Sequence, residues 1–315
     1  MTKRIQLPAA ILAVMIGAGC EAPLNMEQVV AEQANPVRRF DMFQAAAQGA
    51  GLIVVVSSMG SAVVSDDNGN TWNRSELPGR PSLIDVTACS DGSLFALDTQ
   101  RRIWQLMDEG TGWESSAIDT TENTLSIHCA PDDTLWVSAS FSTLYSRAAN
   151  EEGWREFSLY EDLQFTAVRF VDASTGFAVG EFGTVLVTTD GGASWDAAEP
   201  VPNEFYPMAA DFMDESTGWV GGLDGVIWQT RDGAQSWERQ STPTSTPVYN
   251  ISAGSNHILA AGGSAKLVKL IDGQWENVAG APEVFTYIRG LLSLDNGALL
   301  VAGGGGTLEI IEGTP

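Results

Sequence analysis

The stretch TTDGGASW (residues 188–195) is polar and rich in glycine, yet it ends on the large apolar side chain of Trp195. The carboxylate of Asp190 can accept hydrogen bonds from N–H groups of its own turn, and Gly192 permits a positive φ angle. Trp195 can pack as an apolar anchor. The stretch therefore predicts a hairpin turn that is capped by its own side chains and docked onto a sheet by its tryptophan.

The turn occurs three times, as SDDNGNTW (65–72), TTDGGASW (188–195) and TRDGAQSW (230–237), where Ala234 replaces the glycine. This S/T-x-D-x-G-x-S/T-W pattern is the Asp-box. We expect its residues to be structural and its aspartates to have no catalytic role. The residues concerned are Asp67, Gly69, Trp72, Asp190, Gly192, Trp195, Asp232 and Trp237.

Tryptophans recur at a nearly fixed period, with spacings of 41, 41, 41, 42 and 38 residues from Trp72 to Trp275. Residues 170–195 align with residues 212–237, and a seventh unit without tryptophan follows at 287–313. Within one unit, residues 165–172, 176–181, 184–189 and 194–199 have the composition of short strands between Gly/Asp turns. The sequence therefore predicts an all-β, seven-bladed β-propeller.

The seventh unit supplies three strands before Pro315. We expect PVRRFDM (36–42) to form the missing outer strand and to close the ring, which places the propeller at residues 36–315.

The N-terminus has the form of a signal peptide, with MTKR followed by the apolar run IQLPAAILAVMIGAG (5–19). The small residues before Cys20 resemble the lipobox of bacterial lipoproteins, in which the cysteine is acylated. We expect a signal peptide at 1–19, lipidation at Cys20 and a tether at 20–35. Glu21 favours the outer membrane, facing the periplasm; an ordinary secretory signal is the alternative.

Removal of residues 1–19 leaves 14 basic and 40 acidic residues, a net charge of −26. Such a chain repels nucleic acid, so we expect no nucleic-acid partner. His128 and His257 are far apart and lack metal-ligand spacing, and no glycine loop has the pattern of a phosphate site. We therefore expect no metal, no cofactor and no enzymatic activity.

Cys89 and Cys129 occupy similar places in the first strands of the second and third units. An oxidising compartment favours a disulfide, but equivalent side chains on adjacent blades point the same way, which argues against one. The pattern leaves their pairing open.

A binding site is expected where the loops enter each first strand and where the second strand turns into the third. Arg169 and Asp211 should be neighbours at the central channel, as an ion network or a partner contact. The candidate partner-binding residues are Arg169, Asp211, Arg289, Phe165, Tyr206, Tyr249 and Tyr287. Packing between blades is the alternative role for the aromatic residues.

The pattern F-x-D-x-x-x-G-[FW]-x-V-G, which continues into the Asp-box at 170–195, resembles the photosystem II assembly and stability factor family. The resemblance implies a seven-bladed propeller that holds assembly intermediates, with relatives in non-photosynthetic bacteria. It also implies arginine-mediated client binding, for which Arg101, Arg102, Arg169 and Arg289 are candidates. We therefore expect a monomeric, lipid-anchored scaffold that binds a membrane-associated protein complex; a glycan-binding or glycoside-hydrolysing propeller is the alternative.

Overall fold

The computed structural model describes residues 26–107, 110–149, 151–254, 257–294 and 296–312. The expected signal peptide (1–19) and Cys20 lie outside the described residues. The structure divides into two units, one ending at Asn35 and the other beginning at Pro36. The first unit contains helix α1 (Glu27–Ala34). None of the helices in the described ranges has the length and apolar character needed to cross a membrane.

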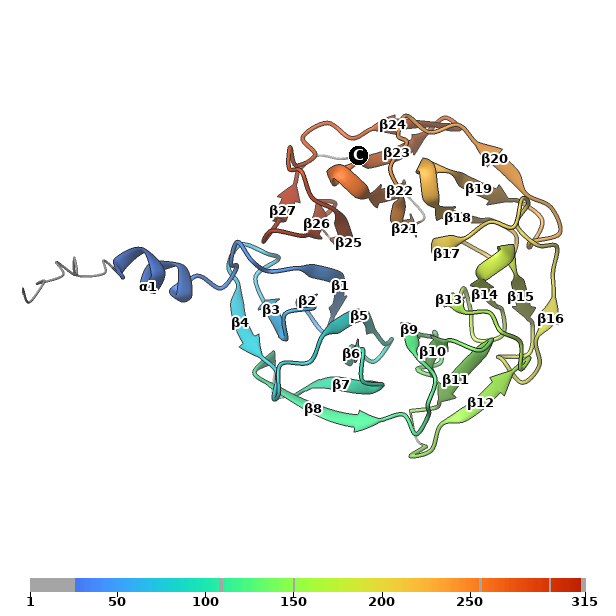
Figure 1. The fold of residues 1–315 in the computed structure, drawn as a ribbon, viewed down its shortest axis with the longest axis horizontal. Coiled ribbons are helices and arrows are strands. Elements are labelled where there is room, and N and C mark those ends of the chain that lie inside the picture. The colour runs from blue at the N-terminus through green and yellow to red at the C-terminus, as the bar shows by residue number, and fades with distance from the viewer. Residues whose placement is uncertain (1–25, 108–109, 150, 255–256, 295, 313–315) are drawn as a thin grey trace, which may run out of the picture. The chain divides into compact units, whose positions relative to one another are not determined.

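The second unit is a ring of antiparallel sheets around a central opening (Figure 1). It is all-β and has seven blades, so the predicted fold is confirmed. In each blade the strands follow one another in sequence order from the channel to the rim. Three of the turns between second and third strands contain a short 3-10 helix: η2 (Glu181–Gly183), η3 (Leu223–Gly225) and η4 (Gly263–Ala265).

Blades one to three contain β1 (Phe43–Gly49), β2 (Leu52–Ser57), β3 (Ser61–Ser65), β4 (Asn73–Glu76), β5 (Leu83–Ala88), β6 (Leu94–Asp98), β7 (Arg102–Met107), β8 (Gly112–Ala117), β9 (Thr124–Cys129), β10 (Leu135–Ala139), β11 (Thr143–Arg147) and β12 (Arg155–Ser158). Blades four and five contain β13 (Phe165–Phe170), β14 (Gly176–Gly180), β15 (Val185–Thr188), β16 (Asp196–Ala197), β17 (Pro207–Phe212), β18 (Gly218–Gly222), β19 (Ile227–Thr230) and β20 (Glu238–Gln240). Blades six and seven contain β21 (Val248–Gly254), β22 (His257–Gly262), β23 (Leu267–Ile271), β24 (Gln274–Asn277), β25 (Ile288–Ser293), β26 (Leu299–Gly303) and β27 (Leu308–Ile311).

The core of the propeller lies between the blades. A cluster of buried apolar side chains fills the space between each pair of neighbouring sheets, including the pair formed by blades seven and one. The second strands are therefore covered on both faces, which explains why β2 has the continuous apolar sequence LIVVVS rather than an alternating one. This packing makes the ring, and not the single blade, the stable unit.

The prediction that residues 36–42 form the outer strand of blade seven was wrong. The described part of that sheet has the three strands β25, β26 and β27. The segment instead reaches the turn after β26, through a bridge between Met42 and Gly304 and a bond from Gly306 N to Asp41 O (2.8 Å). Ring closure comes from this contact and from Phe43 of β1, which is fully buried in the cluster between blades seven and one.

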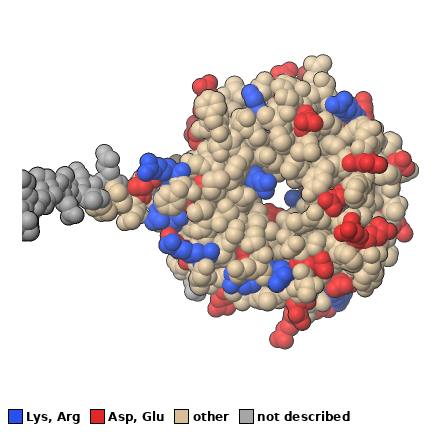
Figure 2. Space-filling view, in the orientation of Figure 1, with Lys and Arg blue, Asp and Glu red and all other residues tan. Residues whose placement is uncertain are grey.

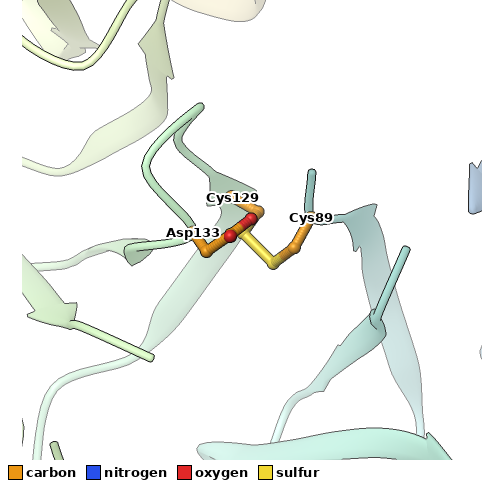
Figure 3. A group of neighbouring side chains, drawn as sticks. All are labelled: Cys89, Cys129 and Asp133. Carbon is orange, nitrogen blue, oxygen red and sulfur yellow. A yellow bond between two sulfur atoms is a disulfide. The ribbon is translucent and has the colours of Figure 1, made fainter. Parts of the chain in front are cut away.

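Cys89 and Cys129 form a disulfide, with their Cα atoms 5.2 Å apart (Figure 3). The argument against this bond was wrong because the two positions are not equivalent. Cys129 lies opposite Leu135 in its blade, and it is Ala88 that lies opposite the corresponding Leu94 in blade two. Cys89 is therefore one residue further along than the equivalent of Cys129. Since side chains alternate along a strand, this offset allows the two sulfurs to face each other.

Candidate functional site

The three Asp-boxes have the same hydrogen bonds. Asp190 accepts bonds from Thr188 Oγ1 (2.8 Å), Ser194 N (2.9 Å) and Ser194 Oγ (2.6 Å). Asp67 and Asp232 accept the corresponding bonds in blades one and five. The bonds from the side chain and the backbone of Ser194 lower the pKa of Asp190 to about 2. These carboxylates are thus ionised and occupied by their own turns.

Each Asp-box also reaches the preceding blade. A Cβ atom built on Gly192 would lie 2.1 Å from Trp136 of blade three, and one on Gly69 would lie 2.2 Å from Ile310 of blade seven. Trp195 packs edge-on against Trp136, with ring centroids 5.6 Å apart. Trp237 donates its indole N–H to Glu199 O in blade four (2.8 Å). The motif therefore joins neighbouring blades as well as closing a hairpin.

A cavity of about 100 Å³ lies in the central channel of the ring and is lined by residues of all seven first strands. Each first strand has an irregularity near its start, and the extra residue there faces the channel. A bulge leaves one residue unpaired and redirects its side chain. The residues concerned are Gln44, Ile84, Leu125, Thr166, Met208, Tyr249 and Arg289.

Arg169 lines this channel and meets Asp211, as expected from their positions, with Arg169 Nε 4.0 Å from Asp211 Oδ1. Asp211 also accepts a bond from Ala253 N (2.8 Å), and Asp85 accepts one from Ile127 N (2.9 Å). Both acids therefore tie their own first strand to that of the next blade. Burial raises the pKa of each of these aspartates, and the charge of Arg169 opposes that rise.

Arg289, Tyr249 and Tyr287 lie together near the starts of β21 and β25. The guanidinium carbon of Arg289 is 4.8 Å from the ring centroid of Tyr249 and 5.9 Å from that of Tyr287. Gln44 Nε2 donates to Tyr287 Oη (2.7 Å). Burial raises the pKa of Tyr287. Figure 2 shows basic side chains at the central opening, while other basic side chains gather over blades one and two on the face in view.

The remaining candidates are spread over the ring. Phe165 was wrongly placed among the partner-binding residues, because it is fully buried between blades three and four. Tyr206 is 38% exposed in the loop that leads into blade five. Arg102 Nε forms an ion pair with Asp98 Oδ2 (2.7 Å), and Arg101 Nη1 donates to Thr121 O (3.3 Å). The arginines implied by the family resemblance therefore do not form one patch.

The sequence analysis expected a binding site on one face of the ring and named Tyr206 there, but it missed Phe141, Tyr160 and Phe182, which are also exposed on that face. We call this the turn face; it is made by the turns between second and third strands and by the loops that lead into first strands. Its exposed large apolar side chains include Phe40, Met59, Phe141, Leu159, Tyr160, Phe182, Tyr206, Leu223 and Phe285. The signal that could have found Phe141 and Phe182 is their position at turns where other blades have Asp224, Ser264 and Gly305.

Three potential metal ligands, Cys89, Cys129 and Asp133, also lie close together (Figure 3). Both sulfurs are in the disulfide, so neither is available as a thiolate. Asp133 Oδ1 accepts bonds from Ser90 N (2.7 Å) and Ser90 Oγ (2.6 Å). This group thus links blades two and three.

His128 is partly buried beside Phe170, with their rings stacked at 6.5 Å. Burial, and then the charge of Arg169, lower its pKa to about 3, so it is neutral at physiological pH. His128 Nε2 has no hydrogen-bond partner among the residues that the structure describes.

A hollow of about 570 Å³ lies between blade three and the Asp-box of blade four. Trp136 and Phe157 provide apolar surface, and Asp132, Glu156 and Asp190 provide carboxylates. Asp190 accepts hydrogen bonds from Ser194 of its own turn. One wall of the hollow is therefore the Asp-box itself, the motif that joins the two blades.

The family model of the photosynthesis system II assembly factor YCF48 matches residues 145–248. The photosystem II assembly lipoprotein Ycf48 of Synechococcus sp. (strain CC9902) is 31% identical over 155 residues, which are 48% of this chain. The match spans about half the length of that relative, 46%.

Solved structures share the whole ring. YCF48 bound to a D1 peptide has a TM-score of 0.71 at 14% identity, over 88% of this chain and 93% of the other. A catalytically inactive virginiamycin B lyase from Staphylococcus aureus has a TM-score of 0.73 at 12% identity, over 86% and 95%. At these identities the likeness concerns the fold. The shared fold and the sequence matches together show that this chain is a seven-bladed Asp-box propeller similar to the photosystem II assembly factor YCF48.

Proposed function

We propose that this protein is a non-catalytic scaffold or assembly factor that binds a membrane-associated protein complex in the cell envelope. The observation that carries this proposal is the turn face. Large apolar side chains are exposed around it, including Phe182, Tyr206 and the fully exposed Phe285. Extended exposed apolar surface, and aromatic residues in particular, mark contact sites between proteins.

The Asp-box aspartates offer little to catalysis. A general acid or base needs a pKa near the working pH and a free oxygen, whereas Asp190 has a pKa of about 2 and bonds to its own turn. Asp85 and Asp211 likewise accept hydrogen bonds from backbone N–H groups of the next blade. The likeness to a lyase concerns the propeller fold alone, so it adds no support for an enzyme.

The proposal includes a lipid anchor at Cys20, after a signal peptide at 1–19 and before a tether at 20–35, with the propeller at 36–315. Support comes from the small residues and cysteine at 17–20 and from a relative named as an assembly lipoprotein. Durable attachment requires more than one acyl chain, which lipoprotein-type modification supplies. We place the protein as a monomer on the outer membrane, facing the periplasm.

The test is an affinity pull-down of the full chain from gently solubilised envelopes, with Cys20→Ser as the matched variant. We expect a stoichiometric membrane-protein partner with the wild type and a reduced yield when the anchor is removed. Retrieval of no membrane protein, together with retention on a polysaccharide column, would contradict the proposal and favour glycan recognition.

A further inference from the structure

Three exposed aromatic residues on the turn face have left-handed backbone conformations. Phe141 has a φ angle of 57°, Tyr160 of 58° and Phe182 of 59°. Their side chains are 44%, 74% and 60% exposed, respectively. A bulky L-residue in this region is a genuine outlier, because its Cβ is crowded against the backbone. Burial does not compensate for that strain, since these side chains face solvent.

Equivalent turns in other blades show what folding alone requires. Asp224, Ser264 and Gly305 occupy the position of Phe182 in blades five, six and seven, with φ angles of 55°, 54° and 68°. These are small or polar residues, and Gly and Asp adopt the left-handed region at low cost. An aromatic residue at 141 or 182 is thus unnecessary for the turn. Strained exposed residues of this kind point to a function at the surface.

The three residues are held on one rigid support. The turn at Phe141 is tied to the loop at 159–163 by Ser142 N to Leu163 O (2.6 Å) and by Glu161 N to Ser142 Oγ (2.9 Å). The same loop is tied to the turn at Phe182 by Glu181 N to Gln164 O (3.0 Å) and by Gln164 N to Glu181 Oε2 (3.0 Å). We call Phe141, Tyr160 and Phe182 the aromatic platform. A support fixed in advance loses less entropy on binding.

Acidic residues surround this platform. Glu161 and Asp162 follow Tyr160 directly and are exposed, and Glu181 precedes Phe182. Glu122 lies beside the first turn, where Ser140 Oγ donates to it (2.6 Å). On the blade-two side, Arg101 Nη1 donates to Thr121 O (3.3 Å), next to Glu122 in the chain. The platform therefore combines aromatic faces with an excess of negative charge.

We propose that the aromatic platform docks a polypeptide segment that carries arginine or lysine beside apolar side chains. The inference rests on the proposed function, because it identifies where and by what chemistry the membrane-protein partner is held. Aromatic faces attract guanidinium and ammonium groups, and the neighbouring carboxylates add complementary charge. The same carboxylates oppose insertion of the platform into a bilayer, where a charge without a partner is costly to bury.

The first test replaces all three platform residues with asparagine (Phe141→Asn, Tyr160→Asn and Phe182→Asn) in the full chain. Asparagine adopts the left-handed region at low cost, so the thermal midpoint of the triple variant should be equal to that of the wild type or higher. The yield of partner in the envelope pull-down should fall at least tenfold. Matched controls are Ser264→Asn, at the equivalent exposed turn of blade six, and Ile271→Ser, which removes an exposed apolar side chain from the opposite face.

The second test places p-benzoylphenylalanine at 141, 160 or 182, with position 271 as control, and irradiates intact envelopes. We expect adducts from the platform positions alone, mapped to a partner segment with arginine or lysine beside apolar residues. Adducts with lipid, with a second copy of this chain or with an acidic segment would overturn the inference, as would no protein adduct. If the triple variant retrieves the partner in full yield, the scaffold proposal stands and the platform inference fails. If the wild type retrieves no membrane protein, the scaffold proposal itself fails.

Discussion

Gly192, at the apex of the Asp-box of blade four, lies directly against the indole of Trp136 in blade three. A Cβ atom at position 192 would be 2.1 Å from Trp136 Cη2, which is far inside the contact distance of two carbon atoms. The φ angle of Gly192 is 80°, so two separate constraints require glycine here. One is the backbone conformation, and the other is the close approach of the neighbouring blade.

Substitution of this glycine separates the two constraints. We expect Gly192→Ala to reduce the free energy of unfolding by about 3 kcal/mol, from left-handed strain and overpacking together. Gly273 has the same φ angle of 80°, but a Cβ atom there would have nothing within 4 Å, so Gly273→Ala should cost only about 1 kcal/mol. Urea denaturation measures both. Equal costs would show that the contact with Trp136 does not restrict position 192.

The Asp-box aspartates should make the stability of the protein depend on pH. Hydrogen bonds lower the pKa of Asp190 from 3.8 to about 2 in the folded state. A carboxyl whose pKa is depressed by folding contributes stability above its unfolded pKa, and that contribution is lost as pH falls through the folded value. We therefore expect Asp190→Asn to lower the thermal midpoint at pH 7, with a difference from wild type that shrinks between about pH 4 and pH 2. Asp66→Asn, at an exposed neighbouring position of another Asp-box, is the charge control. A difference that is constant with pH would contradict the role of ionised Asp190.

The disulfide should contribute measurably to stability. Cys89 and Cys129 are 40 residues apart in sequence, and the bond between them restricts the unfolded chain. We expect the double substitution Cys89→Ala and Cys129→Ala to cost about 2–4 kcal/mol of unfolding free energy. Thermal unfolding with and without reductant provides the control, since reductant should destabilise the wild type and leave the variant unchanged. If the wild type unfolds at the same temperature before and after full reduction of its disulfide, this expectation is wrong.

The architecture could be predicted from the sequence because each repeat carries its own local signals. Gly176 and Gly180 mark strand ends within one blade, and Trp195 belongs to a series of tryptophans that recurs once in each repeat but the seventh. Features that depend on the relation between blades were harder to predict. The one-residue offset between Cys89 and Cys129 becomes clear only when the strand pairings of two blades are compared, and Phe165 is buried in the cluster between blades three and four.

The candidate site was predictable only in part. The meeting of Arg169 with Asp211 follows from the repeat alone, since each directly precedes the matching phenylalanine of its unit. The channel-facing direction of Tyr249 and Arg289 depends on bulges, which shift the alternation by one residue and leave no clear mark in the sequence. The exposure of Tyr160 and Phe182 runs against the ordinary preference of aromatic residues for the core.

The N-terminal closure of the ring depends on a buried ion pair between Asp41 and Arg74. Arg74 Nη1 and Nη2 donate to Asp41 Oδ2 (2.8 Å) and Oδ1 (2.9 Å), and the Asp41 side chain is fully buried. Arg74 Nη2 also donates to Ser61 Oγ (2.7 Å) and Nη1 to Pro36 O (3.0 Å). Asp41 O in turn accepts the bond from Gly306 N of blade seven. The pair thus connects the N-terminal segment, blade one and blade seven.

Removal of one member of the Asp41–Arg74 pair should lower the free energy of unfolding more than removal of both members. We expect Asp41→Ala to cost about 3–5 kcal/mol, because the buried Arg74 guanidinium loses its two hydrogen bonds to Asp41, and the ion pair that remains to it among the described residues is the longer contact of Nε with Glu76 Oε1 (3.5 Å). The double variant Asp41→Leu with Arg74→Met should recover most of that loss, since apolar residues can replace a buried pair. The exposed Arg80, which forms an ion pair with Glu76, is the control, and Arg80→Ala should change stability by less than about 1 kcal/mol. Denaturant unfolding of the wild type and the three variants measures these costs. If the double variant is less stable than Asp41→Ala, the ion pair stabilises ring closure by more than the neutralisation of its two charges.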